Sequence, residues 1–369
     1  MCRLAAITSS EYISPLEPIL ALETMKEGHD GSGLGIMLKD LGGEFRELKD
    51  YPVLSGICSD SGMELLDRYM DEHGFKVRHA WTPTIKEVKG VIRRDHYFAR
   101  AYYYPESYLD KPMREKEDLL LKTRLDLRRM GQADESIIVF SFYPDVLAVK
   151  EVGDPLQLSE FFGLDNSSLK AKIVLAQGRQ NTNYAINLYA CHPFFIQGFS
   201  TMTNGENTAF VPIREYLMGR GLPGYVGYHS DSEVFTHILH YMVRQLGYPL
   251  EYYKHVITPL RPAEIEARQD REVLDLLKKS LRMLCIDGPN CVIGFTPEGT
   301  CFMLQDSKKL RPGMVGGVKG RYALMSEECG VDKAVPGRDR TKDIFPMKHD
   351  MVIISPGAEE VKVWNQLRD

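Results

Sequence analysis

The chain has 369 residues, 43% of them hydrophobic and 26% charged, which is the balance of a globular protein rather than of a disordered or membrane-embedded one. Its formal net charge of -5 argues against a polyanionic partner such as nucleic acid. The sequence contains no apolar run of about 18 residues and no basic signal-like start, so we expect a cytoplasmic protein without a membrane segment.

The first forty residues predict a strand, a helix and a glycine-rich turn. Residues 3–8 form a short apolar run typical of a buried strand, and residues 15–26 have the pattern of a helix that ends at Gly28. Three glycines at 31–35 then lead into an apolar stretch. Because glycine tolerates close backbone approach and left-handed conformations, this segment indicates a turn that feeds a second strand.

The region of residues 60–135 is more polar than its surroundings and predicts mainly helices. Two helical patterns, at 62–73 and 114–130, flank an aromatic segment at 97–104. We expect this region to be a helix-rich insertion packed on the core of a single domain that spans residues 1–369.

The remaining elements alternate between paired strands and helices. Strand patterns with turn residues between them, or a single apolar strand, occur at 136–150, 172–177, 291–304 and 351–364, and helical patterns occur at 232–246 and 263–284. Turns are expected at Tyr143-Pro144-Asp145 and Pro297-Glu298-Gly299. Since strands come in hairpin pairs, the sequence predicts an α+β fold with antiparallel sheets rather than a doubly wound parallel sheet.

The seven cysteines are scattered, odd in number and lack a CxxC pair, so they indicate neither a disulfide framework nor a metal site. Cys2 differs from the others by its position. Removal of Met1 would place a thiol and a free α-amine on one residue. An α-amine titrates near about 7.7 to 8.0, so it can serve as the general base for its own thiol. Taken alone, a cysteine at this position is more often a buried strand residue than a nucleophile.

Three downstream segments favour the interpretation of Cys2 as a nucleophile. They read AQGRQNTN at 176–183, ACHPFFIQGFSTMTNGENTAF at 190–210 and HSDSEVF at 229–235. Together with Cys2, and in this order, they resemble the class II glutamine amidotransferases, which are N-terminal nucleophile hydrolases, and most closely the amidotransferase part of glutamate synthase. GPNCVIGF at 288–295 and KKLRPG at 308–313 also resemble strands of that family. The resemblance implies a four-layer αββα sandwich.

Two charged residues match the family's recognition of the glutamine backbone. Arg179 follows an apolar strand, and its planar guanidinium suits a bidentate contact with the substrate α-carboxylate. Asp231 matches the acid that receives the α-ammonium group. The plainer alternatives are a surface salt bridge for Arg179 and a helix N-cap for Asp231.

Asn204 and Gly205 match the family's oxyanion hole, in which a side-chain amide and a backbone N–H face the developing tetrahedral oxygen. Such donors typically contribute about 3 kcal/mol each to transition-state stabilisation. The plainer alternative is that Asn-Gly forms a hairpin turn.

Other positions receive supporting roles or depart from the pattern. His192, in the HPF-like element, is interpreted as a substrate-site residue that supports the substrate loop or polarises the site, with a structural histidine as the alternative. The HDGSG segment at 29–33 is interpreted as giving backbone support. Arg3, Gly178 and Thr203 stand where the family more often has glycine, threonine and histidine. These departures remove none of the primary groups.

The resemblance implies hydrolysis of glutamine to glutamate and ammonia through a Cys2 thioester. The sequence shows no P-loop, Rossmann fingerprint or evident acceptor domain, so no cofactor is expected in this chain. Ammonia would pass to a partner synthase subunit carrying flavin and iron–sulfur centres. An alternative is a catalytically silent subunit with the same fold. Nucleic-acid binding through the basic and aromatic segment 93–100, or another amidase activity, has less support.

Overall fold

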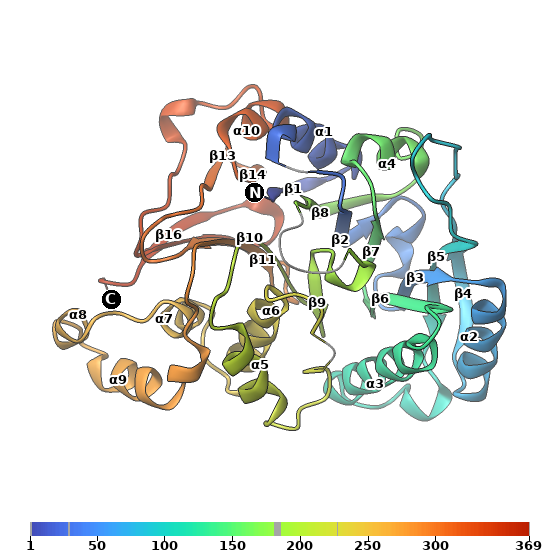
Figure 1. Ribbon diagram of the computed structural model, residues 1–369, viewed down its shortest axis with the longest axis horizontal. Coiled ribbons are helices and arrows are strands. Elements are labelled where there is room, and N and C mark those ends of the chain that lie inside the picture. Colours follow the sequence, from blue (N-terminus) through green and yellow to red (C-terminus); the bar gives the residue numbers. More distant parts are fainter. Residues whose placement is uncertain (1, 29, 181–185, 227, 369) are drawn as a thin grey trace.

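A computed structural model describes residues 2–28, 30–180, 186–226 and 228–368 (Figure 1). The parts of the predictions that fall on Met1, His29 and residues 181–185 lie outside these ranges. Two six-stranded antiparallel sheets lie between two groups of helices, and a four-stranded sheet is added at one side (Figure 1).

The first sheet carries the N-terminal strand near its centre. Its strands, in spatial order, are β13 (Met314–Val318), β14 (Arg321–Met325), β1 (Arg3–Ile13), β8 (Lys170–Gly178), β2 (Leu34–Gly42) and β7 (Val146–Glu151). The central strands β2 and β8 are buried almost throughout, because helices cover one face and the second sheet covers the other. The predicted strand at the N-terminus is therefore confirmed, and β1 starts one residue after Cys2.

The second sheet is built from the C-terminal hairpins and the segment that contains Asn204. Its strands, in spatial order, are β16 (Val361–Asn365), β15 (Asp350–Ile354), β12 (Cys301–Gln305), β11 (Asn290–Phe295), β10 (Phe199–Gly205) and β9 (Phe194–Ile196). The two hairpins predicted around Pro297-Glu298-Gly299 and at 351–364 are confirmed as β11–β12 and β15–β16.

Helices cover the outer faces of both sheets (Figure 1). On the first sheet lie α1 (Leu16–Thr24), α4 (Pro155–Phe161) and α10 (Glu328–Ala334). On the side of the second lie α5 (Phe210–Met218), α6 (Glu233–His240) and α7 (Glu251–Ile257), and beyond them α9 (Arg271–Ser280) packs against α7 and α8 (Pro262–Glu266) against α9. The α+β class and the αββα order of layers expected from the sequence are confirmed. No helix among the described residues is both long and apolar enough to cross a lipid bilayer.

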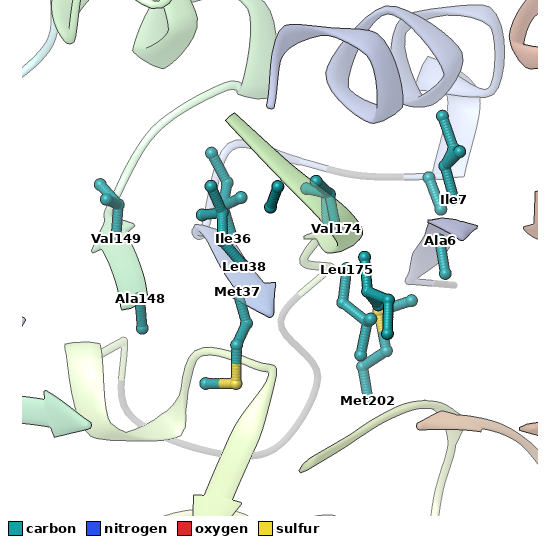
Figure 2. Packing of buried hydrophobic residues seen from close by; sticks show 14 of the residues in the cluster. Ala6, Ile7, Ile36, Met37, Leu38, Ala148, Val149, Val174, Leu175 and Met202 are labelled. Atoms are coloured by element: carbon teal, nitrogen blue, oxygen red, sulfur yellow. The ribbon is translucent and has the colours of Figure 1, made fainter. Parts of the chain in front are cut away.

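The main core fills the space between the two large sheets and the space under α1. Side chains alternate along each strand, so Met37 and Leu175 extend toward Met202 of β10 while Ile36 and Val174 lie on the opposite face (Figure 2). All five are at most 1% exposed. The two sheets are thus joined chiefly by apolar packing, which is strong but not directional.

The segment at 60–135 differs from the helix-rich insertion predicted by its polarity. It contains α2 (Asp60–Glu72) and α3 (Met113–Gly131), as expected, but also two strands of the third sheet. That sheet is ordered β4 (Lys76–Trp81), β5 (His96–Tyr103), β3 (Pro52–Cys58) and β6 (Ile137–Pro144). Strand β4 is exposed along most of its length, so most of its side chains are polar. For this reason the apolar pattern used to predict strands did not reveal it.

The basic segment at 93–100 lies in and before β5, and two of its three arginines, Arg94 and Arg100, are paired. Arg94 contacts Glu151 at 3.1 Å, and Arg100 pairs with Asp67. These two guanidinium groups therefore do not form an unneutralised basic surface of the kind that binds nucleic acid.

The two strands predicted at 136–150 are present, but the pairing expected between them is wrong. The strands at 136–150 do not form a hairpin: β6 pairs with β3 in the third sheet, and β7 pairs with β2 in the first. Asp145 lies between them with φ 58°, and its carboxylate accepts a hydrogen bond from the N–H of Leu41. This contact ties the start of β7 to β2, so the chain passes from one sheet to the other.

The helix predicted at 263–284 is divided into α8, α9 and a short 3₁₀ turn at Arg282–Leu284. The first break falls at the buried Arg268, whose guanidinium contacts both oxygens of Asp270 at 2.9 and 3.1 Å. The apolar periodicity continued across this break, which is why the sequence pattern alone did not reveal it.

Candidate active site

A small cavity forms where the start of β1, the end of β8 and the end of β10 meet. Its volume is about 100 Å³, well below the roughly 300–1,000 Å³ of pockets for drug-sized ligands, so it suits a small ligand. It is lined by Cys2, Arg179, Gln180, His192, Thr203, Asn204, Gly205, Glu206, Ser230, Asp231, Ser232 and Arg311. All six residues predicted for catalysis or substrate binding are therefore brought together.

Cys2 lies at the N-terminal end of the first sheet, immediately before β1. The backbone N–H of Gln180 donates to its Sγ at 3.4 Å. Burial raises the pKa of the Cys2 thiol, although the Gln180 contact and the nearby Arg179 act in the opposite direction. The thiol is therefore neutral at pH 7, and a base has to remove its proton before it can act as a nucleophile.

Arg179 follows β8 directly and is 6% exposed, so the interpretation as a surface salt bridge is wrong. Its backbone is held by the glycine-rich segment. The N–H of Arg179 donates to the carbonyl of Gly33 at 2.8 Å, and its carbonyl accepts from the N–H of Asp30 and the hydroxyl of Ser32, both at 3.3 Å. This arrangement confirms the backbone role predicted for the described part of the segment.

Asp231 is 5% exposed and lies two residues before α6. Its Oδ2 accepts the N–H of Asn207 at 2.7 Å, and its Oδ1 accepts the hydroxyls of Ser232 and Ser230 at 3.2 and 3.3 Å. The helix-capping interpretation is thus wrong, because Ser232 occupies the N-cap position. Burial raises the pKa of Asp231, whereas these hydrogen bonds favour its charged form.

Asn204 and Gly205 are the last two residues of β10 and pair with Cys291 and Asn290 of β11. The interpretation as a hairpin turn is therefore wrong. The Nδ2 group of Asn204 is buried and has no hydrogen-bond partner among the described residues. Because buried donors in native proteins are usually satisfied, an amide left over at a cavity wall indicates a donor kept for a ligand.

Gly205 allows two strands to approach closely, which leads to a prediction about stability. A Cβ at this position would lie 2.1 Å from the carbonyl oxygen of Pro289 and 2.7 Å from the Cα of Asn290. We expect Gly205→Ala to lower the free energy of unfolding by about 2 kcal/mol or more, measured by urea denaturation. Gly337→Ala is the matched control, since a Cβ there meets nothing within 4 Å. Equal midpoints for the two variants would contradict the prediction.

His192 links the cavity wall to β10. Its Nδ1 accepts the backbone N–H of Thr203 at 3.0 Å, which places the ring proton on Nε2. Burial lowers the pKa of His192 well below its usual value, so the ring is neutral and able to accept this bond. The residue therefore has a structural contact in addition to its place in the cavity wall.

The departure at Arg3 is explained by contacts away from the cavity. Its Nε donates to the carbonyl of Met25 at 3.2 Å, and its guanidinium contacts Glu327 at 2.7 Å. Arg3 therefore ties β1 to the end of α1 and the start of α10. Gly178 lies opposite Arg3 in the pairing of β1 with β8.

Sequence reasoning missed several residues of the cavity wall, notably Arg311 and Glu206. Arg311 belongs to the segment 308–313, which was expected to be a strand but is a loop between β12 and β13. Its carbonyl accepts a hydrogen bond from Nε2 of Gln305 at 2.6 Å. The local sequence of this segment did not indicate a place in the cavity wall, because the pairings of β12 with β15, and of β13 with β1 through β14, bring it there.

Comparisons with solved structures give likenesses in fold. A glutamine phosphoribosylpyrophosphate amidotransferase from B. subtilis aligns over 99% of this chain and 49% of its own, with a TM-score of 0.49 and 15% identity. An allosteric regulatory enzyme of purine biosynthesis aligns over the same shares, with a TM-score of 0.51 and 14% identity. A glutamine aminotransferase class-II domain protein from Silicibacter pomeroyi aligns over 90% and 98%, with a TM-score of 0.31 and 11% identity.

The second of these likenesses shows a shared fold, and at 14% identity it shows the fold alone. The other two TM-scores, below 0.5, add nothing to the argument. This chain spans about half the length of the first two proteins. No family model and no curated protein matches the sequence.

Proposed function

We propose that this chain hydrolyses glutamine to glutamate and ammonia, with Cys2 as the nucleophile once Met1 has been removed. The observation that carries the proposal is the single cavity lined by a thiol, an amide donor without a partner among the described residues, a buried guanidinium and a buried carboxylate. These groups match the four demands of the reaction: attack, oxyanion stabilisation, and recognition of the α-carboxylate and α-ammonium groups.

In the proposed reaction the α-amine of Cys2 takes the thiol proton, and the thiolate attacks the carboxamide carbon of glutamine. The oxygen of the tetrahedral intermediate accepts hydrogen bonds from Nδ2 of Asn204 and the N–H of Gly205. The C–N bond breaks, and the leaving nitrogen takes the proton from the α-amine to depart as ammonia. Water then attacks the thioester, which releases glutamate and restores the thiol.

The test of the function is an intact-mass measurement combined with a glutaminase assay. We expect the mature protein to have lost the mass of one methionine and to release glutamate from glutamine. A panel of peptides and acylated amines should be poor substrates, because the small cavity and the Arg179 and Asp231 pair select a zwitterionic amino acid. A mature chain that begins at Cys2 and releases no glutamate, even with a partner present, would refute the proposal.

Substrate recognition gives a separate prediction. We expect Asp231→Asn to raise the KM for glutamine about 10- to 100-fold with a smaller change in kcat, because it removes the counter-charge for the substrate ammonium in both ground and transition states. Steady-state kinetics at several glutamine concentrations measure the split. Asp287→Asn, at a carboxylate that accepts from Thr208 outside the cavity, is the control and should leave KM unchanged. An unaltered KM in Asp231→Asn would contradict the role.

We further propose that the ammonia passes to a separate synthase subunit, and that this subunit is a flavin- and iron–sulfur-containing glutamate synthase partner. Support comes from the sequence resemblance to the amidotransferase part of glutamate synthase. Mixing the chain with such a subunit should produce glutamine-dependent glutamate synthesis. With Cys2→Ala in place of wild type, the subunit should make glutamate from free ammonia but not from glutamine. Equal synthesis from both nitrogen sources with Cys2→Ala would count against transfer of ammonia from this chain to the subunit.

A catalytically silent subunit with the same fold is the second candidate. It is favoured by Thr203, which stands where the family more often has histidine, and it would follow if Met1 were retained and acylated the required amine. The mass measurement and the glutaminase assay separate the two candidates, since the silent subunit would bind glutamine without releasing glutamate.

A further inference from the structure

The proposed nucleophile and the proposed oxyanion donors belong to different sheets. Cys2 precedes β1 of the first sheet, whereas Asn204 and Gly205 end β10 of the second. Apolar packing holds these sheets together, and such packing tolerates small displacements. Since a misplacement of about 1 Å in a catalytic group costs on the order of 100-fold in rate, directional contacts between the sheets near the cavity are of particular interest.

Such contacts converge on the backbone of Thr203, the residue before Asn204. Its N–H donates to Nδ1 of His192 at 3.0 Å, and its carbonyl accepts from Nε2 of Gln177 at 2.9 Å. Both bonds are buried. The N–H and carbonyl of one strand residue point to the same side, so the two side chains occupy the place that a neighbouring strand would otherwise fill.

The length of β9 explains why this place is open. β9 pairs with β10 only from Phe199 to Thr201, and the last partner is Phe194. Thr203 lies two residues beyond that point, while its other side faces β11. The two side chains therefore satisfy an edge of β10 that would otherwise be buried without hydrogen bonds.

Gln177 reaches this edge from the first sheet. It belongs to β8, where it pairs with Leu4 of β1 and with Gly35 of β2. Gln177 is therefore close to two residues of the cavity. Its pairing partner Leu4 is two residues after Cys2, and Arg179 is two residues after Gln177 itself. Its amide gives a direct hydrogen bond from the sheet of the nucleophile to the strand of the oxyanion donors.

His192 is itself anchored to the first sheet. Lys150 of β7 donates from Nζ to the carbonyl of Cys191 at 2.5 Å. Gly35, which pairs with Lys150, lies so close to His192 that a Cβ there would be 1.6 Å from the His192 carbonyl oxygen. The segment that contains His192 therefore packs against β2 and β7.

We propose that Gln177 is a positioning residue that, together with His192, fixes Asn204 and Gly205 relative to the Cys2 sulfur. This inference rests on the proposed glutaminase activity, and it concerns a residue that never touches the substrate: Gln177 is absent from the cavity wall. Its contribution is to the geometry of the transition state and not to the binding of glutamine.

The test compares Gln177→Met with Gln197→Met. Methionine keeps the length of the side chain and removes the donor. Gln197 is also a buried glutamine, 4% exposed, but its amide bonds to Asp118 and His240 away from the cavity. We expect Gln177→Met to lower kcat about 10- to 100-fold with KM for glutamine nearly unchanged, whereas Gln197→Met should retain kcat even if its unfolding midpoint falls.

A second readout isolates the nucleophile. The rate of alkylation of Cys2 by iodoacetamide, followed by mass spectrometry, requires no oxyanion hole and should be the same in wild type and Gln177→Met. Gln177→Asn, which withdraws the amide by one methylene group, serves if the methionine variant does not fold, with a reduced kcat and an unchanged KM again expected.

The outcomes separate the two claims. An active wild type with an unchanged kcat in Gln177→Met, or in Gln177→Asn where that variant is the folded one, overturns the positioning role alone. An equal loss of kcat in Gln197→Met also overturns it, because the effect would then come from general destabilisation. A mature wild type without glutaminase activity overturns the proposed function and the inference together.

Discussion

Replacement of Cys2 by alanine is expected to lower the turnover number for glutamine hydrolysis about 10⁴-fold or more, because the variant has no atom that can form the thioester. The donors and the charged groups of the cavity would remain, so glutamine binding should persist. Burial raises the pKa of the thiol, so the nucleophile depends on a base, and acetylation of the mature N-terminus should abolish activity in the same way.

The matched control is Cys285→Ala, which removes another partly buried thiol that lies outside the cavity. It should retain the wild-type rate. Incubation of wild type with glutamine, quenched in acid, should also reveal a glutamyl adduct by mass spectrometry, and Cys2→Ala should lack this adduct. Residual activity of Cys2→Ala above a few per cent would rule out the thioester mechanism.

The strands were predictable where local pattern and tertiary pairing agree. The hairpins around Pro297-Glu298-Gly299 and at 351–364 combine apolar runs with turn residues, and each closes on its own neighbour in sequence. At Asp145 the same local pattern failed. Its carboxylate bonds to Leu41, about a hundred residues earlier in the chain, and this distant contact decides which sheet receives β7.

The sequence predicted those residues of the candidate site that belong to motifs of recognisable composition and order along the chain. Cys2, Arg179 and Asp231 were identified from a resemblance, and they do line one cavity. Gln177 could not be found in this way, because its contribution depends on a backbone carbonyl of another sheet. A glutamine inside an apolar strand run was the available signal, since a buried polar side chain requires a partner.

Asn204 is the position where activity and stability should separate most clearly. We expect Asn204→Ala to lower kcat about 100- to 1,000-fold, the usual effect of removing one oxyanion donor. Its Nδ2 is buried without a partner among the described residues, so the folded state already bears the cost of that unsatisfied donor. Removing the amide should therefore leave the free energy of unfolding nearly unchanged, although a buried side chain is lost.

Asn365→Ala provides the opposite pattern and is the control. Its Nδ2 donates to Asp350 at 2.7 Å between β15 and β16, far from the cavity wall, so its removal should reduce stability and spare kcat. Asn204→Asp sharpens the comparison, because it keeps the shape of the side chain while placing an acceptor, and at neutral pH a negative charge, against the developing oxyanion. Its kcat should fall below that of Asn204→Ala; a higher value would mean that the amide acts through packing and not as a donor.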